Sequence, residues 1–242
     1  MPPDTPDFAV RSAQREILDE PCEREVLRAY LRDIARTNRW TLGYRPTLHW
    51  LESTKPALAS LGRPLRILDV GCGYGDGLRR IEQWARSRSG AVQLTGIDIN
   101  ADTIAIAAES SPGASRIRWI CADVFAYEPP EPIDLIVSAL FTHHLDDDEI
   151  LRFLAWTERH AQFGWFINDL SRAAVPYHVF RAFSRLIGLH PFVQKDGPVS
   201  ITRAFVPEDW RRMCATAGLD SSAFRIQSFK PARLCVARSK QR

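Results

Sequence analysis

Apolar and polar residues follow two different periods along this chain. In residues 11–61, apolar positions such as Val26, Tyr30 and Ile34 recur every three or four residues, and this spacing predicts amphipathic helices. In residues 65–168, short apolar and β-branched runs alternate with segments of helical spacing, which is typical of a parallel α/β sheet. The pattern therefore predicts N-terminal helices followed by an α/β domain.

The strand–helix alternation is interrupted once before the chain ends. Residues 170–206 depart from it, and residues 176–187 within them have the spacing of an amphipathic helix. Another helix is expected from Pro207, where an acidic first turn suits the helix dipole, to about Gly218. Two strands then complete a predicted set of seven. The expected strands are residues 67–70, 92–98, 117–120, 133–139, 165–168, 224–228 and 233–238.

The most informative local pattern is the glycine cluster after the first expected strand. Residues 67–77 read Ile-Leu-Asp-Val-Gly-Cys-Gly-Tyr-Gly-Asp-Gly, which places Gly71, Gly73 and Gly75 at alternate positions. Glycines allow a tight strand-to-helix turn and a close approach of a ligand to the backbone. A dinucleotide site requires Gly-x-Gly-x-x-Gly, which this spacing does not provide. Asp69 would repel a pyrophosphate and attract a cation, such as an ammonium or a sulfonium group.

This glycine pattern resembles the first motif of the class I S-adenosylmethionine-dependent methyltransferases, Asp/Glu-x-Gly-x-Gly-x-Gly. The resemblance covers residues 64–170 through specific motifs and the remainder only in layout. It implies a Rossmann-like α/β fold with a seven-stranded sheet, in which the final strand is antiparallel and lies next to the fifth. It also implies S-adenosylmethionine as the cofactor. A glycine-rich turn without a ligand is the plainer alternative.

Acidic residues mark the ends of the second and third expected strands, at the sheet edge where ligands of open α/β sheets bind. Asp98 stands where a carboxylate accepts hydrogen bonds from both ribose hydroxyls, although it could instead cap the helix expected near residue 101. The resemblance assigns Asp123 to the adenine amino group and the backbone of Val124 to the adenine ring, whereas an aspartate at a strand end is otherwise a common turn former. The resemblance also places Asp69, Gly71, Cys72, Gly73, Ile99, Ala122 and Ala139 in contact with the cofactor.

Two adjacent histidines follow the fourth expected strand. In the resembled family, the loop at this position meets the methyl-donor end of the cofactor. A base can assist methyl transfer to a hydroxyl group by taking its proton, and histidine titrates in the range that suits this task. His143 and His144 are therefore the candidate catalytic residues, one as the base and the other holding the loop or the acceptor. A structural histidine pair at the start of a helix is the alternative.

Asp146–Glu149 form an acidic run directly after the histidines. The helix dipole and capping favour acidic side chains in a first helical turn, so the run predicts a helix start and not a metal site. Metal-dependent catechol-type methyltransferases need an acid at the end of the fourth strand and an Asp-Asn pair after the fifth. Here the fourth strand ends in Ser138-Ala139 and the pair is reversed as Asn168-Asp169, so we expect no metal.

Four residues are expected on the acceptor side of the site. Asp169 and Arg172 follow the fifth strand, where they either contact the acceptor or form a salt-bridged turn. Tyr177 belongs to the amphipathic helix, which we interpret as part of an acceptor-binding lid over about residues 172–206. Core packing, or a helix that lies on a membrane surface, is the alternative for this helix. Trp40 lies in a polar and aromatic segment between two expected helices and could cover the site.

Composition limits the class of protein. The chain has 242 residues, a formal net charge of +3 and five cysteines without Cys-x-x-Cys spacing. This charge balance argues against a nucleic-acid-binding protein, and the cysteines indicate neither a zinc site nor a disulfide framework. Without a signal-peptide pattern or an apolar run of about 20 residues, we expect a cytoplasmic protein with no transmembrane segment. The expected organisation is a disordered segment, 1–9, N-terminal helices, 10–62, and a methyltransferase domain, 63–242.

These patterns together predict a methyltransferase that acts on a small molecule. The loops after the fourth and fifth strands resemble those of ubiquinone/menaquinone-type and polyketide-tailoring enzymes, which implies an aromatic or quinone-like acceptor methylated on oxygen or carbon. An NAD(P)-dependent oxidoreductase on a similar sheet and a non-catalytic protein that binds S-adenosylmethionine are the alternatives. The acceptor and the oligomeric state stay open.

Overall fold

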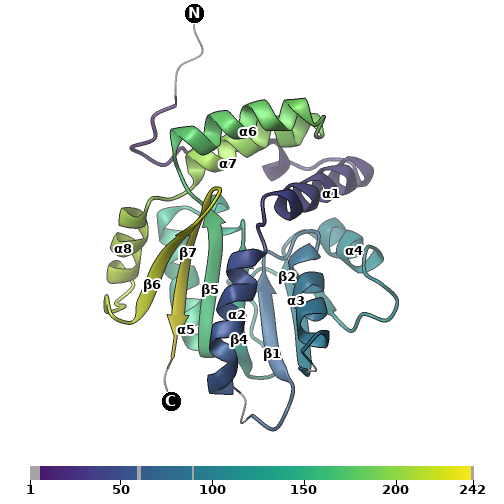
Figure 1. The fold of residues 1–242 in the computed structure, drawn as a ribbon, viewed down its shortest axis with the longest axis vertical. Helices are drawn as coiled ribbons and strands as arrows, with labels where there is room; N and C mark the ends of the chain where they lie inside the picture. Colours follow the sequence, from purple (N-terminus) through teal and green to yellow (C-terminus); the bar gives the residue numbers. More distant parts are fainter. Residues whose placement is uncertain (1–5, 59–60, 89, 241–242) are drawn as a thin grey trace, which may run out of the picture.

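A seven-stranded sheet forms the centre of the protein (Figure 1). The computed structural model describes residues 6–58, 61–88 and 90–240. The strand order is β3-β2-β1-β4-β5-β7-β6, and β7 is antiparallel to both of its neighbours, β5 and β6. This is the Rossmann-like sheet that the sequence predicts, with the final strand inserted next to the fifth. The strands are β1 (Leu65–Val70), β2 (Val92–Asp98), β3 (Arg118–Cys121), β4 (Ile133–Ala139), β5 (Ala161–Leu170), β6 (Phe224–Phe229) and β7 (Arg233–Ser239).

The central strands are apolar because helices cover both faces of the sheet. Leu68 of β1 and Leu135 of β4 are fully buried, as expected for parallel strands in the middle of an α/β sheet. None of the helices in the described ranges is long and apolar enough to cross a membrane. The helices that flank the sheet are α2 (Arg45–Leu58), α3 (Asp76–Arg86), α4 (Ala101–Glu109), α5 (Asp147–His160) and α8 (Pro207–Thr216).

A cap lies beyond the carboxyl ends of the parallel strands, at the top of Figure 1. Asp33 of the cap accepts a hydrogen bond from the backbone N–H of His190 at 2.7 Å. Asp196 accepts the backbone N–H groups of Ile17 and Leu18 at 2.9 and 3.3 Å. These bonds join segments from opposite ends of the chain into one cover. The cap consists of η1 (Ile17–Asp19), α1 (Arg24–Trp40), α6 (Ala174–Leu186) and α7 (Pro191–Arg203).

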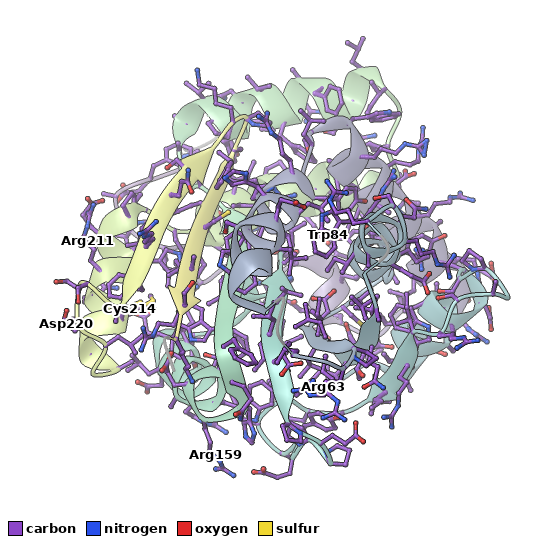
Figure 2. The ribbon with its side chains drawn as sticks, turned by 60° about the horizontal axis from the view of Figure 1, so that its bottom comes forward. Arg63, Trp84, Arg159, Arg211, Cys214 and Asp220 are labelled. Atoms are coloured by element: carbon purple, nitrogen blue, oxygen red, sulfur yellow. The ribbon has the colours of Figure 1, made fainter. Side chains whose placement is uncertain are left out.

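A buried ion pair holds the opposite edge of the sheet, where the parallel strands begin. Arg63 donates two hydrogen bonds to the carboxylate of Asp134 in β4, at 2.7 and 2.8 Å, and Asp134 is fully buried. Arg63 lies at this edge, in the lower part of Figure 2. A buried carboxylate is tolerated when such a bidentate partner compensates it. This edge is therefore structural, and the edge under the cap is the one that can hold a ligand.

The N-terminal segment makes specific contacts that its composition does not predict. Residues 1–9 are expected to be disordered, and residues 1–5 of them lie outside the described residues. The carbonyl groups of Phe8 and Ala9 accept hydrogen bonds from the Arg172 guanidinium at 2.9 and 3.2 Å. Phe8 also packs edge-on against Tyr177. Phe8 and Ala9 thus have partners that are distant in sequence, while the expectation of disorder for residues 1–9 stays a prediction.

Candidate active site

The glycine cluster after β1 has the backbone conformation that requires glycine. Gly71, Gly73 and Gly75 have φ angles of 66°, 51° and 74°, a region that other residues rarely adopt. A Cβ atom at Gly71 would lie 2.5 Å from the Phe141 ring, and one at Gly75 would lie 2.2 Å from the Trp119 ring. A Cβ at Gly73 would meet nothing within 4 Å. Gly73 therefore leaves its backbone open to a ligand, whereas the other two glycines permit close packing.

A cavity of about 1260 Å³ lies between this loop and the cap. The carboxyl ends of β1, β2 and β4 and the loop after β3 form one side, and the cap forms the other. Its volume exceeds the usual range of small-molecule sites, so it can hold two ligands together. Every predicted cofactor residue except Asp69 lines this large cavity: Gly71, Cys72, Gly73, Asp98, Ile99, Ala122, Asp123, Val124 and Ala139.

Asp69 lines a second, small cavity of about 60 Å³ beside the glycine loop. Its side chain is buried, with only 6% of the residue exposed. Burial raises the pKa of Asp69 well above its usual value, and repulsion from Asp76 and Asp98 raises it further. A ligand cation would relieve this concentration of negative charge. The environment of Asp69 therefore agrees with the cation preference inferred from the sequence.

Asp98 holds the glycine loop and still presents its carboxylate to the large cavity. It accepts the backbone N–H of Gly73 at 3.1 Å and that of Asn100 at 3.0 Å. Burial raises its pKa, while these two backbone hydrogen bonds lower it. Asn100, and not Asp98, caps α4 by accepting the backbone N–H of Thr103. The capping alternative is thus excluded, and the carboxylate remains available to hydroxyl groups of a ligand.

His143 is fixed by the carboxylate of Asp169. The Nδ1 atom of His143 lies 2.7 Å from an oxygen of Asp169, whose other oxygen accepts the backbone N–H of His143 and the hydroxyl of Thr142. Burial raises the pKa of Asp169, but the charge and hydrogen bonds of His143 outweigh it and hold that pKa below its usual value. An ionised carboxylate only accepts, so Nδ1 carries a proton. When Nδ1 carries the only ring proton, Nε2 is an acceptor.

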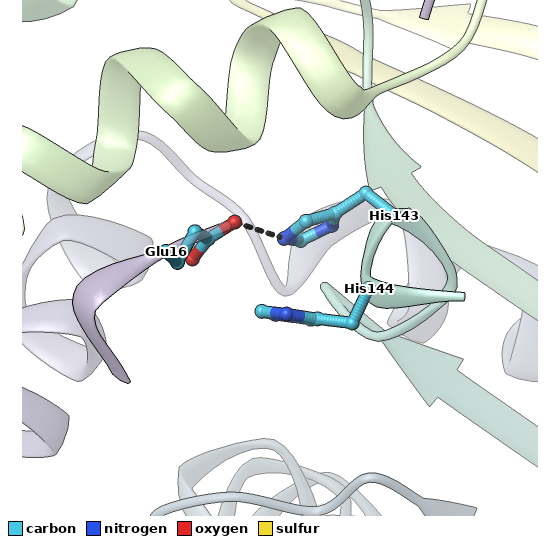
Figure 3. Close-up of side chains that lie close together, drawn as sticks. All are labelled: Glu16, His143 and His144. Atoms are coloured by element: carbon cyan, nitrogen blue, oxygen red, sulfur yellow. Dashed lines mark ion pairs between the residues drawn. The ribbon is translucent and has the colours of Figure 1, made fainter. Parts of the chain in front are cut away.

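Glu16 of the N-terminal segment faces this nitrogen (Figure 3). Its Oε1 lies 3.6 Å from Nε2 of His143 and accepts the hydroxyl of Ser200 at 2.8 Å. His144 lies beside them and pairs through Nδ1 with Asp19 at 3.2 Å. The three possible ligand atoms of Glu16, His143 and His144 lie within 4.8 Å of one another, so this group could hold a cation. The sequence did not predict it, since Glu16 lies more than a hundred residues from the histidines.

The acidic run Asp146–Glu149 has the structural role that the sequence predicts. Asp146 accepts the backbone N–H of Glu149 at 2.8 Å, and the Glu149 carboxylate accepts the backbone N–H of Asp146 at 3.0 Å. This reciprocal pair is a capping box at the start of α5. Helix capping thus accounts for both side chains.

Comparison with known proteins identifies the fold that carries this site. Residues 67–164 match the family described as a methyltransferase domain. A segment of 99 residues is 36% identical to trans-aconitate 2-methyltransferase of Streptomyces avermitilis. Over residues 67–164, the chain is therefore similar to the methyltransferase domain of class I S-adenosylmethionine-dependent enzymes. The aligned segment covers 39% of this chain and 35% of the Streptomyces enzyme, so the two proteins match over about a third of that enzyme's length.

Solved structures extend the likeness of the methyltransferase fold to almost the whole chain. The plantazolicin methyltransferase BpumL, in complex with a pentazolic desmethylPZN analog and SAH, has a TM-score of 0.62 at 14% identity. The match covers 90% of this chain and 97% of BpumL. The magnesium protoporphyrin IX methyltransferase (ChlM) from Synechocystis PCC 6803 with bound SAH has a TM-score of 0.52 at 16% identity, covering 82% and 84% of the two chains. At these identities the likeness concerns the fold.

Not all predicted acceptor residues of the methyltransferase domain reach the large cavity. Trp40 lines it and packs edge-on against Phe183 of α6. Asp169 is fully buried behind His143, so it supports a candidate base and does not face the acceptor. Arg172 is buried, pairs with Asp209 at 2.8 Å and donates to backbone carbonyl groups. Tyr177 packs outside the cavity. Sequence position alone did not reveal which side of the backbone these residues occupy.

Proposed function

We propose that this protein transfers the methyl group of S-adenosylmethionine to a small, largely apolar acceptor. The observation that carries the proposal is the convergence of the glycine loop, Asp98 and the Asp169-supported His143 on one cavity. The cofactor would occupy the sheet side, with its ribose at Asp98, its adenine near Asp123 and Val124, and its methionine portion toward Asp69. The acceptor would occupy the cap side.

The acceptor side of the large cavity is apolar and aromatic. Leu27, Tyr30 and Ile34 of α1 face it, together with Phe180 and Phe183 of α6. Burying such a surface against a flat apolar ligand is favourable, and aromatic side chains add stacking or edge contacts. These walls support an aromatic, quinone-like or polyketide-like acceptor. They offer few charged groups that would recognise a nucleic acid backbone.

His143 supplies a proton acceptor for transfer to a hydroxyl group. S-adenosylmethionine would supply the methyl group by in-line displacement, in which the acceptor oxygen replaces sulfur on the methyl carbon and S-adenosylhomocysteine is left. Nε2 of His143 would take the hydroxyl proton. The resulting imidazolium lies between the carboxylates of Asp169 and Glu16, which stabilise its charge. Acceptor atoms that need no deprotonation would not use this base.

Calorimetric titration with S-adenosylhomocysteine, with NADH as the control, tests the cofactor. We expect micromolar binding of the first and no binding of the second. A screen of phenols and quinols, followed by mass spectrometry for the gain of one methyl group, then identifies the acceptor class. Binding of NADH in place of S-adenosylhomocysteine would overturn the proposal in favour of an oxidoreductase.

A further inference from the structure

Arg233 occupies an unusual place for a charged residue. It is the first residue of β7, and its strand partner is Leu170 at the carboxyl end of β5. Its side chain is only 6% exposed, yet it lines both the large and the small cavity. The small cavity is also lined by Asp69. Arg233 thus stands at the junction between the proposed cofactor space and the interior.

The guanidinium of Arg233 lacks the partner that burial requires. Its Nη2 donates to Oδ1 of Asn38 at 2.7 Å, whereas Nη1 is buried without a hydrogen-bond partner in the described part of the chain. No carboxylate of the described residues lies within ion-pair distance of it. A second buried guanidinium, that of Arg172, is paired with Asp209 at 2.8 Å. An unpaired buried charge is costly and indicates a partner that arrives with a ligand.

We propose that Arg233 binds the carboxylate group of a ligand at the junction of the two cavities. This inference rests on the proposed function. A guanidinium presents a planar pair of N–H groups that matches a carboxylate, and Nη1 is the donor still available. The nearby acids Asp69 and Asp76 favour a ligand that also carries an ammonium group, and they disfavour a dianionic phosphate. A singly charged carboxylate therefore fits the site best.

Two ligands of a methyltransferase could supply this carboxylate. One is the donor, whose methionine portion has a carboxylate beside its ammonium group, so that Arg233 and Asp69 would together recognise a zwitterion. The other is an acceptor that carries a carboxylate. Arg233 lines both the large cavity, which would hold donor and acceptor, and the small cavity beside Asp69, so it could reach the carboxylate of either ligand.

The donor is tested by comparing S-adenosylhomocysteine with its decarboxylated analogue, S-adenosyl-3-thiopropylamine, on the wild type and Arg233→Met. If Arg233 binds the donor carboxylate, removing either group weakens binding by about 10- to 100-fold, the range of a charge-assisted hydrogen bond. Removing the guanidinium and the ligand carboxylate together should then weaken binding little more than removing either group alone. Arg66→Met, which changes a surface arginine paired with Glu131, is the matched control and should bind both ligands as the wild type does.

The acceptor is tested with 4-hydroxybenzoate and 4-cresol, which differ by the carboxylate. Both are titrated into protein saturated with S-adenosylhomocysteine and into ligand-free protein. If Arg233 binds an acceptor carboxylate, the wild type prefers 4-hydroxybenzoate by about 10-fold or more and Arg233→Met loses this preference. Arg233→Lys keeps the positive charge without the planar pair of donors. It should therefore retain part of the carboxylate preference that Arg233→Met loses.

Thermal unfolding without ligand separates recognition from a structural role. Replacing an unpaired buried charge with methionine should leave the melting temperature unchanged or raise it. The proposal would be overturned if the melting temperature of Arg233→Met fell strongly while Arg233→Lys kept the ligand preferences of the wild type. It would also be overturned if both variants bound all four ligands with wild-type affinity. If the wild type fails to bind S-adenosylhomocysteine, the proposed function fails, and the 4-hydroxybenzoate comparison on ligand-free protein still decides the role of Arg233.

Discussion

Asp169 determines which ring nitrogen of His143 carries a proton, because its carboxylate accepts from Nδ1. In Asp169→Asn, an amide group can donate to Nδ1 and would favour the tautomer with its proton on Nε2, which cannot act as a base. We expect turnover with the identified acceptor to fall by about 10²- to 10⁴-fold, with no change in affinity for S-adenosylhomocysteine. Single-turnover methyl transfer and calorimetry measure the two quantities. His143→Gln should behave alike, and wild-type turnover in both variants would place the base elsewhere.

The same carboxylate links stability to pH. The pKa of Asp169 in the folded protein lies below its ordinary value of 3.8, so folding favours the ionised form. Its stabilisation is therefore fully present above about pH 4 and is lost as the pH falls through the lowered pKa. Urea unfolding should show Asp169→Asn less stable than the wild type by about 3–5 kcal/mol at pH 7. This difference in unfolding free energy should become smaller toward pH 2. A difference that does not depend on pH would contradict the assigned role of the carboxylate.

Asp98 carries the predicted contact with the ribose. Asp98→Ala removes a carboxylate that two hydroxyl groups would otherwise bind, and it also releases the backbone N–H of Gly73. We expect affinity for S-adenosylhomocysteine to fall by about 1–3 kcal/mol, measured by calorimetry. Asp148→Ala, at an exposed acidic position of α5, is the control and should bind normally. Unchanged affinity of Asp98→Ala would remove this residue from the cofactor site.

Residues that follow the parallel strands were predictable, whereas those that reach the site from the N-terminal segment and from β7 were not. Asp98 and His143 follow strands whose apolar runs are visible in the sequence, so the sheet edge they share could be inferred. Glu16 and Arg233 reach the site from segments far away in the chain, and neither belongs to a motif. The orientation of Asp169 depends on the hydrogen bonds of the η2 turn (Thr142–His144), which no periodicity reports.

The contact between α6 and α7 shapes the acceptor side of the cavity. A Cβ atom at Gly197 of α7 would lie 2.0 Å from the ring of Phe180, which lines the large cavity. Gly197→Ala must therefore displace this ring. We expect a loss of about 1–3 kcal/mol in unfolding free energy, typical of overpacking, and a changed affinity for acceptors but not for S-adenosylhomocysteine. Urea unfolding and calorimetry test the two effects.

Gly113 provides the matched control for this substitution. A Cβ at Gly113 would meet nothing within 4 Å, so Gly113→Ala should unfold and bind ligands as the wild type does. Equal behaviour of the two alanine variants would show that Phe180 moves aside freely and that the α6–α7 contact does not limit the acceptor space.

The strands were more predictable than the cap elements because their signals are local. The second and fourth strands begin and end where the apolar runs predict, at Val92–Asp98 and Ile133–Ala139. The fifth is longer than expected, Ala161–Leu170, because pairing with β7 extends it to Leu170 and pairing with β4 begins at Ala161. In residues 170–206, only the first helix has a clear apolar face. α7 contains Gly197 and Pro198, residues that disfavour a helix, and its form depends on contacts with η1 and α6.

The cap and the sheet form one molecule around the cavity, and a ligand should stabilise them together. A ligand that binds only the folded state adds about 2.7 kcal/mol at a concentration 100 times its Kd. For a chain of this size, the melting temperature should rise by about 5–10 °C.

Circular dichroism reports the sheet and helices, and fluorescence of the seven tryptophans reports both layers, since Trp40 lies in the cap and Trp119 in β3. The melting temperatures from both signals should rise by the same amount with S-adenosylhomocysteine. The rise should be smaller for Asp98→Ala at equal ligand concentration. Asp98 at the sheet edge, His143 after β4 and Glu16 of the N-terminal segment all line this one cavity. A rise in the melting temperature from fluorescence alone, with none from circular dichroism, would mean that the ligand stabilises the cap but not the sheet. The cap and the sheet would then not unfold as one unit.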